Sequence, residues 1–131
     1  MDLDATSPLR NVEDISGAYK QFKDEDADIL ITASPARKNP YFNMVEKMND
    51  RIQEVKKLET PPTRRQDAPQ VYDMNASIYI WKRQALLEND TMFRDRTSLY
   101  VMPEERSVDI DTELDWDFVE FMIGKMTSIH D

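Results

Sequence analysis

Two aspartates separated by one residue, Asp109 and Asp111, are the residues whose type and spacing most directly suggest chemistry. In an extended segment their side chains point the same way, while Val108 and Ile110 face the opposite side and could be buried. Two carboxylates in one small volume repel unless a proton or a cation intervenes, and Mg²⁺ prefers such hard oxygen ligands. The alternative is a solvated strand end before an acidic first turn of a helix, where Asp and Glu are favoured. The spacing alone leaves both interpretations open.

The amino-acid composition disfavours several other classes of function. A chain of 131 residues suits a single domain with a moderate core. Because it has no cysteine and its one histidine is His130, disulfides, cysteine zinc sites and histidine-centred catalysis are disfavoured. With 26 acidic against 17 basic residues, the net charge of −9 argues against non-specific binding to nucleic acid or acidic membranes. No apolar run approaches the roughly 18 residues of a membrane span, and no secretory signal is visible, so we expect a cytoplasmic protein.

The first third of the chain predicts a strand, a helix and a second strand. Residues 1–4 alternate, and residues 12–24 have apolar side chains at helical spacing behind Asn11, a favourable N-cap with Asp14 three residues on. A second strand is predicted over residues 28–33, where the residues after Asp28 are apolar or β-branched without interruption, as in a strand buried on both faces. This order is a βαβ unit, and residues 1–4 look like a strand in the middle of a sheet.

The middle of the chain is less clear. Residues 41–57 have near-helical apolar spacing, which favours a helix, but Asn49 and Asp50 form a turn signal that would divide the stretch into a hairpin. Residues 59–70 contain three prolines and therefore predict a loop. Within that loop, Arg64 and Arg65 are candidates for gripping an anionic ligand, although an exposed basic pair is the simpler interpretation.

The last part of the chain alternates strands and helices. Strands are predicted over residues 71–81 and 97–102, with a short helix over residues 82–89 between them. A final helix begins near Thr112, an N-cap with Asp115 at its third position. We expect Trp116 and Phe118 on this helix to belong to the core.

Three motifs in order carry a resemblance to a known family: DATSPLR at residues 4–10, RQDAPQVYDMNASIY at residues 65–79 and SVDIDTELD at residues 107–115. Together they resemble the C-terminal part of the N-acylneuraminate cytidylyltransferases, the CMP-sialic acid synthetases. The resemblance implies an α/β fold: a partial Rossmann-like nucleotidyltransferase sheet with flanking helices and a projecting dimerisation hairpin. Residues 1–131 would then be the C-terminal part of a cytidylyltransferase domain. Residues of about 40–60 and 88–96 would form an extension for dimerisation and the sugar site, so we expect a homodimer.

The same resemblance implies substrate-binding residues. Arg65 matches an Arg-Gln pair that contacts the acidic sugar or the triphosphate, and Asn75 and Tyr79 match residues that line the sugar pocket. Phe93 fits an aromatic position that reaches the sugar, often from the partner subunit. Asp4 stands where many sialic acid synthetases have Gln, which points towards members acting on legionaminic or pseudaminic acid. Ala76 replaces a family glycine, a change that matters only if the backbone there needs a positive φ.

The implied reaction is Mg²⁺-dependent nucleotidyl transfer. The anomeric hydroxyl of an acidic nine-carbon sugar attacks the α-phosphate of CTP and gives CMP-sugar and pyrophosphate. Asp109 and Asp111 would hold Mg²⁺, and Asp111 could also accept the hydroxyl proton. The family's glycine-containing triphosphate loop has no counterpart in this sequence, which contains only Gly17 and Gly124. The alternative is therefore a truncated, non-catalytic module that dimerises and binds sugar.

Overall fold

The computed structural model describes residues 1–88 and 90–128, so His130 lies outside the described residues. The chain forms two compact units. The larger unit contains Met1–Ser34 and Met74–Asp131, and the smaller unit contains Pro35–Asp73. Among the described residues, no helix combines the length and the apolar character that crossing a bilayer requires.

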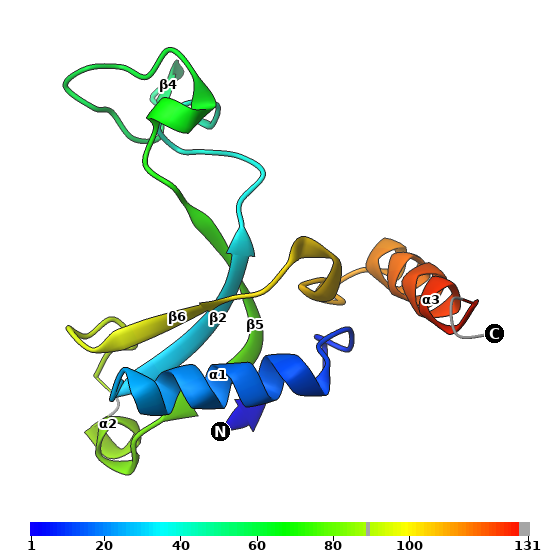
Figure 1. The fold of residues 1–131 in the computed structure, drawn as a ribbon. Helices are drawn as coiled ribbons and strands as arrows, with labels where there is room; N and C mark the ends of the chain where they lie inside the picture. Colours follow the sequence, from blue (N-terminus) through cyan, green and yellow to red (C-terminus); the bar gives the residue numbers. More distant parts are fainter. Residues whose placement is uncertain (89, 129–131) are drawn as a thin grey trace. The chain divides into compact units, whose positions relative to one another are not determined.

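A mixed four-stranded sheet organises the larger unit (Figure 1). β1 is antiparallel to β5, β5 runs opposite to β2, and β2 is parallel to β6 with Ile29 opposite Thr97. β1 is thus an edge strand of the described sheet and not a central one, because the later strand β5 lies between it and β2. In spatial order the strands are β1 (Asp2–Leu3), β5 (Tyr72–Trp81), β2 (Ile29–Pro35) and β6 (Thr97–Val101).

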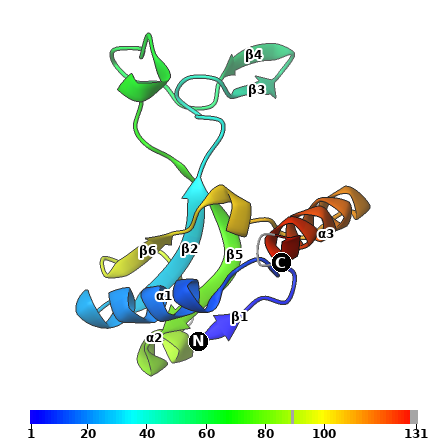
Figure 2. The ribbon, with the colours of Figure 1, turned by 45° about the vertical axis from the view of Figure 1, so that its right-hand side comes forward.

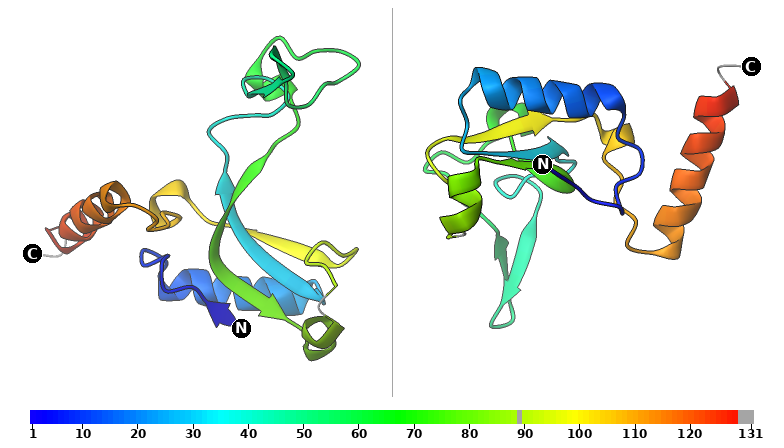
Figure 3. Two further views of the ribbon diagram at one scale, coloured as in Figure 1. Left: turned by 180° about the vertical axis from the view of Figure 1, so that it is seen from behind. Right: turned by 90° about the horizontal axis from the view of Figure 1, so that it is seen from below.

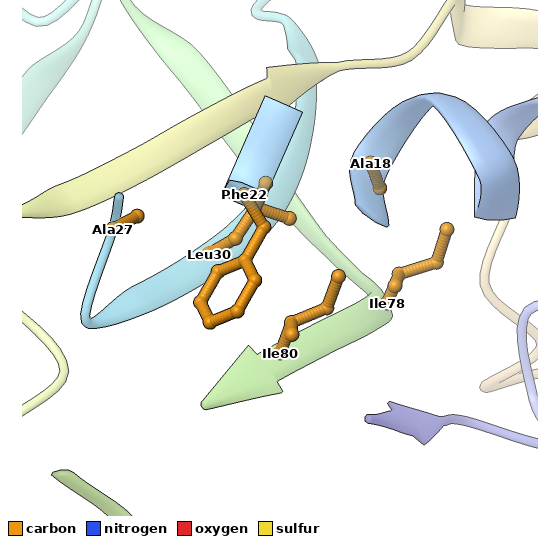
Figure 4. Packing of buried hydrophobic residues seen from close by; sticks show 6 residues of the cluster. All are labelled: Ala18, Phe22, Ala27, Leu30, Ile78 and Ile80. Atoms are coloured by element: carbon orange, nitrogen blue, oxygen red, sulfur yellow. The ribbon is translucent and has the colours of Figure 1, made fainter. Parts of the chain in front are cut away.

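Helix α1 (Val12–Asp24) covers one face of this sheet (Figure 3, right). It begins as predicted, since the Asn11 side chain accepts from the Asp14 N–H while the Asp14 carboxylate accepts from the Asn11 N–H. Its apolar side packs on alternate residues of β2 and β5, as sheet geometry requires (Figure 4). The cluster consists of Ala18, Phe22, Ala27, Leu30, Ile78 and Ile80.

The short helix α2 (Arg83–Glu88) follows β5 and covers the opposite face. Ala85 packs there with Ile29 and Ile31, the β2 residues that alternate with Leu30. Tyr79 and Trp81 join this second cluster, and their rings stack with centroids 5.4 Å apart. Burial of β2 on both faces explains why it is mostly apolar and carries no charged residue.

The smaller unit contains an antiparallel pair, β3 (Val45–Met48) and β4 (Arg51–Glu54), joined at Asn49 and Asp50 (Figure 2). Both turn residues have positive φ, which suits a tight connection between antiparallel strands. The stretch therefore forms strands and not the helix that its apolar spacing also allowed. A single turn of 3-10 helix, η1 (Arg65–Asp67), interrupts the proline-containing loop. A role of the β-pair in dimerisation stays a prediction.

The last helix, α3 (Glu113–Ser128), starts at the predicted place. Thr112 and Asp115 exchange hydrogen bonds, with the Thr112 N–H donating to the carboxylate and the Asp115 N–H donating to the hydroxyl. Placing Trp116 and Phe118 in the core was wrong, because these side chains are 59% and 46% exposed. Val119 is the buried residue of this helix.

Candidate functional site

Residues 107–111, which carry Asp109 and Asp111, form no regular strand, yet backbone and side-chain contacts anchor the segment. It follows a short 3-10 helix, η2 (Glu104–Arg106). Arg106 donates from Nε and Nη2 to the two carboxylate oxygens of Asp14, at 2.8 and 2.9 Å. Further along, the Ile110 N–H donates to the Thr6 carbonyl at 2.9 Å. The segment is therefore held between the start of α1 and the loop after β1.

Asp14 keeps its charge although its side chain is only 1% exposed. Burial alone would raise the pKa of this carboxyl, but the hydrogen bonds from Arg106 and the Asn11 N–H, with the Arg106 charge, outweigh it and lower the pKa. A buried carboxylate with two well-aligned guanidinium contacts is a rigid attachment point.

The two aspartates of the predicted pair differ in environment. Asp109 is half-buried, and its Oδ1 is shielded from solvent without a hydrogen-bond partner in the described chain. Asp111 is exposed, and its N–H donates to the Asp115 carboxylate at 3.1 Å. Among residues 1–88 and 90–128, no three acidic or histidine side chains converge as a metal site. Mg²⁺ is commonly bound by only one or two carboxylates, with phosphates and water as the other ligands.

Asp4 lies at the end of β1, where it stabilises the following loop. Its Oδ1 accepts from the Thr6 N–H at 2.9 Å and from the Thr6 hydroxyl at 2.8 Å. These two hydrogen bonds lower the pKa of Asp4 against the opposing effect of desolvation, and Arg10 adds to the lowering. Arg10 donates from Nη1 to the carbonyls of Asp4, Ser7 and Ser77, so it ties the loop to β5.

Tyr79 lies on β5 and packs partly in the second apolar cluster. It is the register partner of Asp2 in the antiparallel pair. Burial, together with the charges of Asp4, Asp109 and Asp2, raises the pKa of the Tyr79 hydroxyl. The hydroxyl therefore stays protonated and is available as a hydrogen-bond donor. The structure brings Asp4, Tyr79 and Asp109 into one electrostatic neighbourhood.

Asn75 is 6% exposed, and its polar atoms are engaged inside the larger unit. Its Nδ2 donates to the Ser107 hydroxyl at 2.9 Å, and its Oδ1 accepts from the Thr32 hydroxyl at 2.7 Å. The next residue, Ala76, has a φ of 50°, the left-handed conformation that favours glycine. The sequence therefore departs from the family glycine at a position where the backbone does need a positive φ.

Arg65 lies in the smaller unit, where it borders a cavity of about 440 Å³. Its Nη2 donates to the carbonyl of Ala36. Neighbouring Arg64 is 3.8 Å from a carboxylate oxygen of Asp67, an exposed ion pair. The polar residues lining the cavity with Arg65 are Asn39, Gln66 and Gln70.

Phe93 is 67% exposed and lies before the start of β6, whereas Asp109 lies after the end of β6. Within one chain the structure therefore does not bring Phe93 to the carboxylates. The residues that sequence reasoning missed are Arg106, Ser107 and Arg10, which hold the site together. Arg10 and Ser107 carried a signal, as parts of the DATSPLR and SVDIDTELD motifs. Arg106 carried none, because its contact with Asp14 joins residues far apart in the chain.

Comparison with known proteins supports the resemblance. No family model matches the chain. The CMP-N,N'-diacetyllegionaminic acid synthase of Campylobacter jejuni is 55% identical over 124 residues, 95% of this chain and 52% of that protein. The post-translational flagellin modification protein B of Campylobacter coli is 49% identical over 123 residues, 94% of this chain and 52% of that protein. An N-acylneuraminate cytidylyltransferase of Streptococcus agalactiae is 30% identical over 115 residues, 87% of this chain and 27% of that protein.

The chain thus spans about half the length of the first two relatives and a smaller share of the third. Homologues named for CMP-nonulosonic acid synthesis cover nearly all of it. The resemblance to the N-acylneuraminate cytidylyltransferase family, first indicated by three motifs, is confirmed.

Proposed function

We propose that this chain is part of a nucleotidyltransferase that activates an acidic nine-carbon sugar with CTP and releases pyrophosphate. The carrying observation is Asp109, whose Oδ1 is buried with no hydrogen-bond partner among the described residues and whose charge acts on Tyr79. A buried acceptor of this kind is costly unless a ligand satisfies it. The 55% identity to a CMP-N,N'-diacetyllegionaminic acid synthase favours legionaminic-type acids as the sugar. On this proposal the sheet is a part of a Rossmann-like nucleotidyltransferase fold.

Charge supports a divalent cation in the proposed site. Asp2, Asp4 and Asp109 all act on Tyr79, so the neighbourhood is acidic and would repel the triphosphate of CTP. Asp109 and Asp111 would hold Mg²⁺, which when bound neutralises phosphate charge and polarises the α-phosphate. Two features of these residues fit Mg²⁺: Asp109 has a buried oxygen with no partner among the described residues, and all the proposed ligand atoms are oxygens.

The chain's own residues would position the reactants and move one proton. The sugar hydroxyl oxygen forms a bond to the α-phosphorus, the bond to the β-phosphate oxygen breaks, and pyrophosphate leaves with that electron pair. Asp111, being exposed, would accept the hydroxyl proton directly or through water and pass it to solvent. Tyr79 keeps its proton and would donate a hydrogen bond to an anionic group. Arg65 would contact the sugar carboxylate or a phosphate, and Phe93 would act from a partner subunit of a homodimer.

The test is CMP-sugar formation from CTP and N,N'-diacetyllegionaminic acid in the protein that carries this chain. Asp109→Asn and Asp111→Asn should each reduce turnover by at least about a hundredfold, as expected when transition-state charge loses its stabilisation. Asp117→Asn, an exposed residue on α3, is the matched control and should retain turnover. Unchanged turnover in both site variants would remove the pair from the mechanism.

A calorimetric titration of the 131-residue chain with CTP and Mg²⁺ distinguishes the alternative function. Saturable binding that requires Mg²⁺ supports the nucleotidyltransferase proposal. Binding of the sugar acid without any binding of CTP would favour the non-catalytic sugar-binding module instead.

A further inference from the structure

We infer that Asn75 is a positioning residue, which acts through Ser107 to hold the segment carrying Asp109, and that it does not contact the sugar. The expected effect on CMP-sugar formation rests on the proposed function. The expectation that Asn75 holds the segment depends only on contacts within the larger unit. It changes the role expected for Asn75 from the sequence, where the residue was placed in the lining of the sugar pocket.

The hydrogen-bonding sites of the Asn75 side chain are all occupied by other residues of the chain. A carboxamide offers two N–H donors and two acceptor sites on its oxygen. The Oδ1 atom accepts from the Thr32 hydroxyl at 2.7 Å and from the Ser77 N–H at 3.3 Å. The Nδ2 atom donates to the Ser107 hydroxyl at 2.9 Å and lies 3.5 Å from the sulfur of Met102. All four sites have protein partners, and a sugar could bind Asn75 only by displacing one of them.

Contacts between β2 and β5 hold the Asn75 side chain in place. Thr32 is 1% exposed, and its hydroxyl oxygen also accepts the Ile78 N–H at 3.0 Å. In a regular ladder a backbone carbonyl would take that N–H, but the positive φ of Ala76 distorts β5 at this point. The Thr32 side chain therefore joins the two strands and orients the carboxamide.

Ser107 links Asn75 to the segment that carries Asp109. Its hydroxyl accepts from Asn75 and donates to the Pro103 carbonyl at 2.7 Å, which closes the turn of η2. Ser107 is two residues before Asp109 and directly after Arg106, which Asp14 holds. Together with the Ile110 contact to Thr6, these bonds fix the backbone on both sides of Asp109.

Ser107→Ala is the decisive variant because it removes the link and leaves Asn75 in place. We expect hydrogen exchange of the amides in residues 107–111 to rise about 3- to 10-fold, the range for losing one hydrogen bond. The Mg²⁺ concentration giving half-maximal CMP-sugar formation should rise by a similar factor, with the KM for the sugar unchanged. Ser107→Thr keeps the hydroxyl and should restore both values.

Asn75→Ala should reproduce these effects, and the double variant with Ser107→Ala should add little, because both remove the same link. A rise in the KM for the sugar in Asn75→Ala, with exchange at residues 107–111 unaltered, would show direct sugar contact and overturn the inference. Unaltered exchange in Ser107→Ala would overturn it as well. If the wild-type protein forms no CMP-sugar, the proposed function fails, while the exchange measurements still decide whether Asn75 holds the segment.

Discussion

Arg106 and Asp14 are 92 residues apart in sequence, yet the guanidinium of one grips both carboxylate oxygens of the other at 2.8 and 2.9 Å. Asp14 also completes the capping box of α1 with Asn11. The same carboxylate therefore caps the start of the helix and anchors the turn that leads to Asp109. A change at this ion pair should affect both stability and the order of the candidate site.

Replacing Arg106 by glutamine should destabilise the protein by about 3 kcal/mol. The reason is that Asp14 would remain buried without its main partner, and a broken buried pair costs roughly 3–5 kcal/mol. The partial exposure of Arg106 places the value at the low end. Urea unfolding measures the change. Lys20→Gln breaks the exposed Lys20–Asp24 pair and should have far less effect; an equal loss in the two variants would contradict the expectation.

The contribution of this pair should disappear in acid. The pKa of Asp14 is lower in the folded chain than the unfolded value of about 3.9. The stability it contributes is therefore complete above about pH 4 and is lost as the pH falls through the folded pKa. The difference in unfolding free energy between the wild type and Arg106→Gln, measured from about pH 7 to about pH 2.5, should become smaller as the pH falls. A constant difference across that range would assign the stabilisation to packing of the arginine.

Ala76→Gly should stabilise the protein. An alanine in the left-handed region costs roughly 1–2 kcal/mol, whereas glycine adopts that region freely. The extra freedom of glycine in the unfolded chain offsets about 0.4–1 kcal/mol, which leaves a net gain of roughly 0.5–1 kcal/mol. The measurement is the thermal midpoint. Ala5→Gly is the control, because the structure records no positive φ there and only the entropic loss remains. A lower midpoint for Ala76→Gly would refute the expected relief of strain.

The elements that local sequence determines were predictable. Asn11 and Asp14 marked the start of α1, and Thr112 and Asp115 marked the start of α3, because each capping pair lies within one turn. The run of apolar and β-branched residues in β2 indicated burial on both faces. For the middle of the chain, the turn signal at Asn49 was a better guide than apolar spacing, since short strands can share that spacing.

The long-range relationships were not predictable from patterns. Nothing near Arg106 signals Asp14 as its partner, and nothing near Asn75 signals Ser107, because such contacts depend on how the strands are ordered. The edge position of β1 has the same cause, since β5 enters the sheet between β1 and β2. Trp116 was misassigned to the core because apolar character alone does not tell which surfaces a helix buries.

Gly17→Ala should destabilise the protein even though alanine favours helices by about 1 kcal/mol. A Cβ at position 17 would lie 2.6 Å from the Tyr100 hydroxyl oxygen and 3.1 Å from two atoms of its ring, so the Tyr100 side chain or α1 would have to shift. Overpacking of this kind costs about 1–3 kcal/mol. Adding Tyr100→Phe removes the nearest atom and should recover part of the loss. Gly124→Ala, in open space on α3, is the matched control and should stabilise; a gain at position 17 as well would show that no close approach exists.

Asp109→Ala should raise the stability of the metal-free protein while removing its response to Mg²⁺. The Oδ1 of Asp109 is shielded from water and has no partner in the part of the chain that the structure describes, and a buried polar atom left unsatisfied costs about 1–3 kcal/mol. Removing the carboxylate removes that cost, whereas the wild type recovers it only when a cation binds. Thermal unfolding in EDTA and in Mg²⁺ with CTP measures both effects. Asp117→Ala on α3 should behave as the wild type does in each condition. A less stable Asp109→Ala protein in EDTA would mean that this carboxylate serves the fold, and its place in the proposed magnesium site would be lost.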